Sequence, residues 1–305
     1  MRTEFYYPSS GAGTIYGCRW EPEGKPVAVL QIVHGLGGHC MRYDHLAQYF
    51  AAKGFLVVAQ DHMGHGRSTG PQCPRACLEG GWGKAVADVH RLLKTTRLEY
   101  PELPYFLLGH SMGSFLIRSL LIQYPKCGIS GAILCGTGWI HRGMLNSAIA
   151  GATMAGRING FRKPSVRLTE TLFGAFNRKV EHPRTTFDWL SRSSKIVDRY
   201  MEDSLCFHHV TPCLVREMMS GMKFNQEPKN LQQMKKDLPI LLISGGDDPV
   251  GNYGEGVKKT VQAFTAAGME NVSMRLFPLC RHELLSEINR DEVYRFVEEW
   301  MQKQS

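Results

Sequence analysis

The residues best suited to chemistry begin with a serine placed between two glycines. Gly109–Gly113 reads G-x-S-x-G, with Ser111 at its centre. An apolar run precedes this pentapeptide and a run with helical spacing follows it, which is the context of a nucleophile elbow. A serine hydroxyl attacks a carbonyl only with a neighbouring base and with donors for the oxyanion. A Gly/Ser turn without a catalytic role would show the same pattern. The rest of the chain therefore has to supply the base and the oxyanion donors.

An acid and a base follow in the order that such a nucleophile requires. The apolar run Leu238–Ser244 leads into Asp247 and Asp248, and the run Val272–Phe277 leads into His282. Parallel strands present their carboxyl ends along one edge of a sheet, where the site of an open α/β fold is built. A histidine with a pKa near 6.5 can take the serine proton and return it to the leaving group. We therefore expect His282 to be the base and one of the two aspartates to be the acid.

The oxyanion needs two backbone N–H donors. The first expected donor is Met112, directly after the nucleophile. The second is Leu36, in the glycine-rich stretch His34–His39 that follows a buried strand. A glycine-rich loop without a binding role is the alternative for this stretch.

The elements that must position these residues alternate between strands and helices, which predicts right-handed crossovers and a parallel sheet. Continuous apolar runs are typical of strands buried on both faces. We predict an α/β fold with a mostly parallel eight-stranded sheet flanked by helices. The expected strands are an opening hairpin within residues 1–20 and the runs 26–33, 55–59, 104–108, 129–135, 238–244 and 272–277, and the expected helices of the core are 43–53, 84–100, 114–123, 254–267 and 291–302.

The alternation stops after Gly138 and resumes at about Leu238. Helix-like stretches at 144–158, 169–177, 187–192 and 210–222 lie between these points, with no buried strand among them. We predict a mostly helical cap, residues 139–236, inserted after the sixth strand. The core would then consist of residues 1–138 and 237–305.

The net charge of +8 belongs entirely to this inserted stretch. Residues 141–236 hold 16 Lys and Arg against 8 Asp and Glu, and the remainder of the chain is balanced at 20 against 20. No nucleic-acid motif accompanies the charge, so no nucleic-acid partner is expected. The basic residues could attract anionic substrates to the site or could simply form a solvated surface.

Composition predicts a globular enzyme of the cytoplasm. Apolar residues make up 43% of the chain, no run reaches the length of a membrane span, and Glu4 near the start argues against a secretory signal. Nine cysteines are scattered without C-x-x-C spacing, which favours reduced thiols. His62 and His65 beside Asp61 are possible metal ligands, but zinc-type spacing is missing, so no metal and no cofactor are expected.

Four motifs in order carry a family resemblance: His34–His39, Asp61–Ser68, Gly109–Gly113 and Arg281–Leu285. Together they resemble the monoacylglycerol lipase and lysophospholipase branch of the α/β-hydrolases, which is often labelled serine aminopeptidase-like. The resemblance covers roughly residues 10–140 and 236–303. It implies a catalytic triad of Ser111, Asp248 and His282, with the amides of Leu36 and Met112 as oxyanion donors.

The family spacing G-x-x-D runs from Gly245 to Asp248, and Pro249 biases Asp248 towards an extended backbone, so Asp248 is favoured over Asp247. The sequence departs from the family at Gly38, where such lipases often carry a glutamate, and at Met63, where an arginine or leucine is usual. Both departures leave the triad intact.

The resemblance implies a serine hydrolase that cleaves carboxylic esters with one acyl chain, of the monoacylglycerol or lysophospholipid type, through an acyl-enzyme. An aminopeptidase-type amide hydrolase of the same fold and a non-catalytic binding protein are the alternatives. The expected partners are a small acyl ester and, transiently, a lipid surface, and no stable protein partner is inferred.

Overall fold

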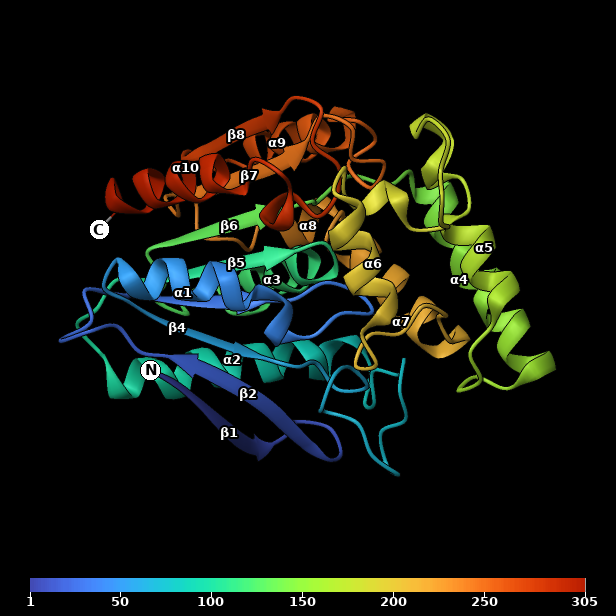
Figure 1. The fold of residues 1–305 in the computed structure, drawn as a ribbon, viewed down its shortest axis with the longest axis horizontal. Coiled ribbons are helices and arrows are strands. Elements are labelled where there is room, and N and C mark those ends of the chain that lie inside the picture. The colour runs from blue at the N-terminus through green and yellow to red at the C-terminus, as the bar shows by residue number, and fades with distance from the viewer. Residues whose placement is uncertain (305) are drawn as a thin grey trace.

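Eight strands form one sheet in the computed structural model, which describes residues 1–304 (Figure 1). Their spatial order is β1-β2-β4-β3-β5-β6-β7-β8. The first two strands run antiparallel to their neighbours, and β4, β3, β5, β6, β7 and β8 are parallel. The strands are β1 (Arg2–Pro8), β2 (Thr14–Trp20), β3 (Ala28–Val33), β4 (Phe55–Gln60), β5 (Tyr105–His110), β6 (Gly131–Cys135), β7 (Ile240–Gly245) and β8 (Val272–Phe277). The predicted fold class and strand count are confirmed.

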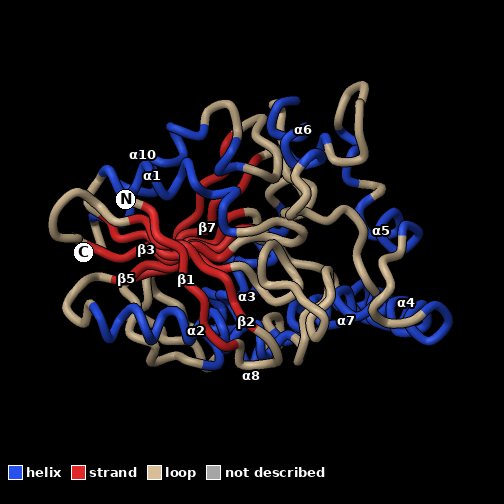
Figure 2. The backbone as a smooth tube through the Cα atoms, turned by 60° about the horizontal axis from the view of Figure 1, so that its bottom comes forward, coloured by secondary structure: helices blue, strands red, loops and turns tan. Residues whose placement is uncertain are grey.

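Helices cover both faces of the sheet, as Figure 2 shows. One apolar cluster joins α1 (Asp44–Ala52) and α10 (Arg290–Gln302) to one face. A second cluster joins α2 (Trp82–Glu99), α3 (Met112–Gln123) and α9 (Glu255–Ala266) to the other face. Because successive side chains of a strand point to opposite faces, a strand covered on both sides is apolar throughout, which explains the continuous runs in the sequence.

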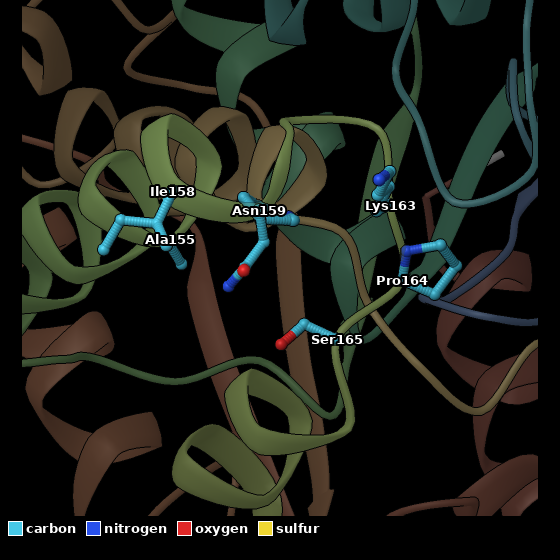
Figure 3. Close-up of a pocket in the computed structure, with 7 residues that line it drawn as sticks. Ala155, Ile158, Asn159, Lys163, Pro164 and Ser165 are labelled. Atoms are coloured by element: carbon cyan, nitrogen blue, oxygen red, sulfur yellow. The ribbon is translucent and has the colours of Figure 1, made fainter.

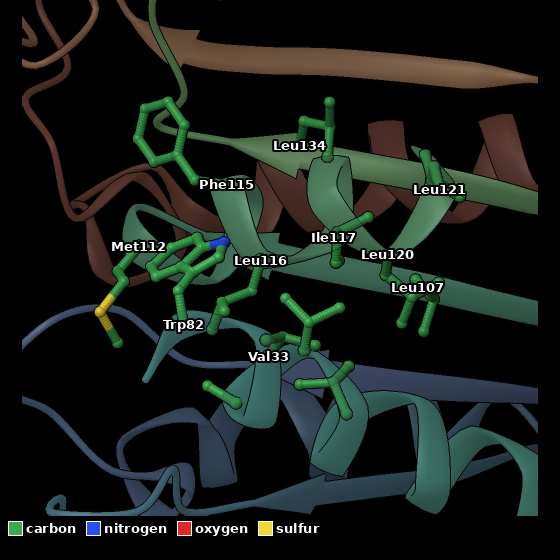
Figure 4. Packing of buried hydrophobic residues seen from close by; sticks show 14 of the residues in the cluster. Val33, Trp82, Leu107, Met112, Phe115, Leu116, Ile117, Leu120, Leu121 and Leu134 are labelled. Carbon is green, nitrogen blue, oxygen red and sulfur yellow. The ribbon is translucent and has the colours of Figure 1, made fainter. Parts of the chain in front are cut away.

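Helix α3 lies at the centre of the second cluster (Figure 4). Leu116, Ile117 and Leu120 are fully buried, and Leu116 and Ile117 lie near Val33 in the close-up. The helix that starts at the nucleophile elbow is therefore held by packing along its length, so the turn before it has a fixed position relative to the sheet.

The segment between β6 and β7 contains only helices and loops among the described residues. It leaves the sheet at the carboxyl ends of the parallel strands (Figure 1). We call residues 139–236 the helical insertion. Its elements are α4 (Arg142–Asn159), α5 (Val166–Phe173), η2 (Phe176–Lys179), η3 (Asp188–Leu190), α6 (Ser194–Glu202), α7 (Pro212–Phe224) and α8 (Pro228–Leu231).

The insertion differs from the sequence prediction in three ways. Helices α6 and α8 were not predicted: α8 spans a single turn, and α6 has apolar residues at helical spacing but is only nine residues long. Of the stretch predicted as helical at 187–192, only the three residues of η3 are helical. The stretch predicted as one helix at 169–177 is divided at Gly174 into α5 and η2. In the described part of the chain, no helix is both long and apolar enough to cross a membrane.

Candidate active site

Ser111 lies on a strained turn between β5 and α3. Its φ of 53° and ψ of −120° are rarely adopted by a residue with a side chain. The two glycines of the motif are required by close backbone approach: a Cβ on Gly109 would lie 2.6 Å from the carbonyl oxygen of Gly113, and a Cβ on Gly113 would lie 2.0 Å from that of Val33. The Ser111 N–H donates to the carbonyl oxygen of Cys135 at 2.9 Å, which ties the turn to β6. The predicted strand–turn–helix context is present.

Asp248 and His282 lie in direct contact at the carboxyl ends of β7 and β8. The Nδ1–H of His282 donates to both carboxylate oxygens of Asp248, at 2.9 and 3.0 Å. The Ser244 hydroxyl and the Val250 N–H also donate to that carboxylate, so Asp248 is fully buried but well satisfied. Asp247 is exposed and makes no such contact with the histidine among the described residues.

The two buried groups shift each other's pKa. Burial lowers the pKa of His282, but the Asp248 carboxylate outweighs burial, and the net pKa of His282 is raised above its ordinary value. Burial also raises the pKa of Asp248, but His282 and the other donors outweigh it, and the net pKa of Asp248 is lowered. The pair is thus arranged to hold an anionic carboxylate beside an imidazole that accepts a proton readily.

His282 is brought against the elbow through His110, the residue before Ser111. The His110 Nε2–H donates to the carbonyl oxygen of His282 at 3.0 Å, and the two rings lie 4.8 Å apart. The other ring nitrogen of His110 accepts from the Tyr43 hydroxyl at 2.9 Å. No hydrogen bond joins Ser111 to His282 within the part of the chain that the structure describes, and such bonds often form only with substrate bound.

The loop after β3 faces the elbow. A Cβ on Gly35 would lie 3.1 Å from the Cβ of Ser111, so the backbone that leads into Leu36 passes directly over the serine. Gly37 has a φ of +73°, a conformation that favours glycine. Met112 is the first residue of α3, and its N–H therefore has no acceptor within the helix. Both predicted oxyanion donors lie on the segments that surround Ser111.

The helical insertion contacts His282 and Glu283 directly. The N–H of His282 donates to the carbonyl oxygen of Trp189 at 3.5 Å, and the N–H of Glu283 donates to that of Leu190 at 2.6 Å. The indole of Trp189 also lies 5.2 Å from the imidazole. Sequence reasoning placed this segment in the insertion without giving it a position beside His282.

An ion pair next to His282 was not predicted. Arg42 donates to the Glu283 carboxylate at 3.0 Å, and the two side chains are only 12% and 10% exposed. Burial raises the pKa of Glu283, but the charges of Arg42, His110 and His282 outweigh it and lower the pKa. Position 38, where the resembled lipases often have a glutamate, is next to this pair: a Cβ on Gly38 would lie 3.1 Å from the Cδ of Arg42. In this chain the carboxylate beside Arg42 is therefore that of Glu283. Its position directly after His282 is the feature of the sequence that could have indicated this contact.

Three buried histidines, His34, His62 and His65, pack together at the start of the loop His34–His39, which we call the Leu36 loop. The N–H of His62 donates to the His34 ring, and the His62 ring donates to the carbonyl oxygen of His34, each at 3.0 Å. Burial lowers the pKa of His62 to about 4 and that of His65 to about 3, so both rings are neutral. Within residues 1–304, Asp61 does not bond to these histidine rings; its carboxylate accepts hydrogen bonds from two backbone amides.

One group of three possible metal ligands occurs in the described residues: His39, Asp203 and Cys206, whose ligand atoms lie within 4.8 Å of one another. His39 already donates to Asp203 at 2.8 Å, and the Arg42 guanidinium lies 4.0 Å from the Cys206 sulfur. That positive charge opposes a cation, and the contacts instead join the Leu36 loop to the insertion.

A cavity of about 330 Å³ lies inside the insertion, between the end of α4 and the starts of α5 and α7 (Figure 3). It is lined by Ala155, Ile158, Asn159, Lys163, Pro164, Ser165 and Pro212. None of the predicted site residues borders it.

Comparison with known proteins gives the family. The sequence model described as "Serine aminopeptidase, S33" matches residues 24–289. A monoglyceride lipase of Rattus norvegicus is 31% identical over 288 residues, which cover 91% of this chain and 86% of the relative. A monoacylglycerol lipase of Mycolicibacterium smegmatis is 27% identical over 304 residues, 98% of this chain and 97% of the relative.

Among solved structures, a thermostable carboxyl esterase from Bacillus coagulans in complex with glycerol has a TM-score of 0.91 at 28% identity, over 99% of this chain and 98% of that one. The strained turn at Ser111, the contact between Asp248 and His282, and these similarities all indicate the same family. The chain belongs to the serine aminopeptidase S33 family, in the monoacylglycerol lipase and lysophospholipase branch of the α/β-hydrolases.

Proposed function

We propose that this protein is a serine hydrolase that cleaves carboxylic esters with one acyl chain, of the monoacylglycerol or lysophospholipid type. Ser111 is the nucleophile, His282 the general base and Asp248 the residue that orients the imidazole. The amides of Leu36 and Met112 hold the oxyanion. The observation that carries the proposal is the bidentate contact of Asp248 with His282 Nδ1, which leaves Nε2 free to act on a serine presented by a strained turn.

The reaction proceeds in two steps. His282 Nε2 takes the Ser111 proton as the serine oxygen attacks the ester carbonyl, and the negative oxygen that forms is held by the two amides. The intermediate collapses to an acyl-serine, and the leaving alcohol takes the proton from His282. Water then attacks the acyl-serine with His282 again as base, and the fatty acid leaves as Ser111 recovers its proton.

The names of relatives support the substrate class: the two relatives compared above are a monoglyceride lipase and a monoacylglycerol lipase. We further propose that the helical insertion, residues 139–236, is a cap over a core of residues 1–138 and 237–305. Its partly buried apolar side chains, such as Leu172 and Phe173, would then border an acyl chain.

Apolar side chains on the outer face of the insertion support transient contact with a lipid surface. Met144, Met154, Ile158 and Val166 are 66%, 57%, 72% and 53% exposed. These residues lie on α4 or at the start of α5, on elements that also carry exposed basic side chains.

An aminopeptidase-type reaction is the second candidate, because the family description names one. Recognition of a substrate ammonium requires carboxylates near the site, whereas the insertion carries an excess of eight positive charges. That charge favours the ester hydrolase.

Fluorophosphonate labelling tests the nucleophile. The native chain should label and Ser111→Ala should not, while an unlabelled native chain would favour a binding protein on this fold. A panel of monoacylglycerols, lysophospholipids, p-nitrophenyl esters and aminoacyl amides then tests the substrate. Higher kcat/KM for the amides than for all esters would overturn the ester assignment.

A further inference from the structure

A second hollow lies beside the loops that carry Asp248 and His282. Its volume is about 210 Å³, and it opens where η2 of the insertion meets these loops. A water occupies about 30 Å³ of liquid, so the hollow has room for a small head group. It is lined by Phe176, Lys179, Val180, Arg192, Asp247, Leu279 and Arg281, and Ser111 does not border it.

The hollow carries positive charge that no carboxylate fully balances. Arg192 is paired with Glu287 at 3.2 Å. Arg281 donates to two backbone carbonyl oxygens, at 2.8 and 3.1 Å, which orient its guanidinium without neutralising it. Lys179 lies 3.5 Å from the centre of a tyrosine ring. Over the described residues, neither Lys179 nor Arg281 has a carboxylate within ion-pair distance. Three cations and two carboxylates, those of Glu287 and Asp247, therefore leave a net charge of about +1 around the hollow.

The other part of the lining is apolar. Phe176 and Val180 are partly buried, and Leu279 is 67% exposed on a backbone with a φ of +63°. An inorganic anion would contact the cations but would leave this apolar wall exposed to water. A singly charged head group with an alkyl chain would use both, because the chain removes apolar surface from water.

We propose that this hollow binds the carboxylate of a fatty acid, with Lys179 and Arg281 as its cationic partners. The identity of the ligand rests on the proposed function, since a fatty acid is the acid product of ester hydrolysis. Because Ser111 does not border the hollow, a fatty acid bound there is accumulated product rather than product still in place at Ser111.

The hollow is connected to the base by a short series of rings. Phe176 lies 4.8 Å from Trp189, and Trp189 lies 5.2 Å from His282. A carboxylate shared by Lys179 of the insertion and Arg281 of the core would fasten these two parts beside the base. We therefore expect bound fatty acid to lower kcat more than it raises KM.

Calorimetric titration with decanoate tests the site. The titrated chain has Ser111 blocked by a fluorophosphonate, so that the acid cannot occupy the acyl site. The blocked chain should bind one decanoate. Lys179→Glu should weaken binding about fivefold or more, since a partly exposed ionic contact is worth up to about 1 kcal/mol and the reversal adds repulsion. The matched control is Arg178→Glu, which makes the same charge change one residue away and outside the lining. Equal effects of the two variants would overturn the proposal.

Ligands with the same chain separate the head group from the apolar wall. Decyltrimethylammonium and decanol should bind far more weakly than decanoate, and equal binding would overturn the carboxylate assignment. Inorganic phosphate that binds as tightly as decanoate would overturn the fatty-acid assignment.

Kinetics supply the second readout. Decanoate should lower kcat of the native chain on a short-chain ester and should lose this effect in Lys179→Glu. Purely competitive inhibition that is unchanged in the variant would overturn the proposal. Failure of Ser111 to label would instead overturn the proposed function, and decanoate binding that still depends on Lys179 would then support the site independently.

Discussion

Arg42 and Glu283 form a buried ion pair at 3.0 Å although they are 241 residues apart in the chain. Arg42 follows the Leu36 loop, and Glu283 directly follows His282. The pair therefore places a carboxylate beside His282, the proposed base, and a compensating positive charge beside the loop of the expected oxyanion donor Leu36. The negative charge of Glu283 contributes to the raised pKa of His282.

Glu283→Gln should shift the acidic limb of the pH–rate profile to lower pH. Without that charge the imidazolium is less favoured, so the pKa of His282 falls and the neutral base persists at lower pH. The measurement is kcat/KM against pH for both chains, with Glu287→Gln, which lies farther along the same loop, as the control. A limb that stays in place or moves to higher pH would contradict the assignment of His282 as base or of Glu283 as its neighbour.

Asp248→Asn should lower kcat by about 10⁴-fold while the chain remains folded, because the amide can stabilise the wrong tautomer of His282 and cannot stabilise the imidazolium. Asp247→Asn is the matched control and should retain most of the activity, since Asp247 is exposed. Steady-state kinetics with circular dichroism of both variants check this. The greater loss in Asp247→Asn would show that the acid has been misassigned.

Gly113→Ala should lower the free energy of unfolding by about 2 kcal/mol or more, because its Cβ would lie 2.0 Å from a backbone oxygen of β3 that has little room to move. Gly151→Ala, in the exposed middle of α4 with no atom within 4 Å of its added Cβ, should stabilise the chain by about 0.5 to 1 kcal/mol. Denaturant unfolding of both variants measures the difference. Equal stability of the two would refute the close approach at the elbow.

An anionic lysophospholipid should lose kcat/KM as salt rises from about 20 to about 500 mM, whereas a neutral monoacylglycerol should change little. The insertion holds the whole positive excess, and salt screens such a field over about 8 Å at physiological strength. Parallel salt titrations of the two substrates make the comparison. Equal responses would mean that the basic residues form a solvated surface without a steering role.

The sequence alone determined the features that depend on local pattern. Continuous apolar runs identified the strands of the core, and G-x-S-x-G identified the strained turn at Ser111, because periodicity and glycine spacing act within a few residues. The same reasoning located the helical insertion but missed α6 and α8, which are only nine and four residues long.

Only the tertiary structure decided which distant side chains meet. It placed Asp248 against His282 and left Asp247 exposed, although the two aspartates are neighbours with the same chemistry. It also paired Arg42 with Glu283 and set Trp189 of the insertion beside the imidazole. These contacts join segments from separate strands and from the insertion, so they follow from how the chain crosses over the sheet and not from any local repeat of residues.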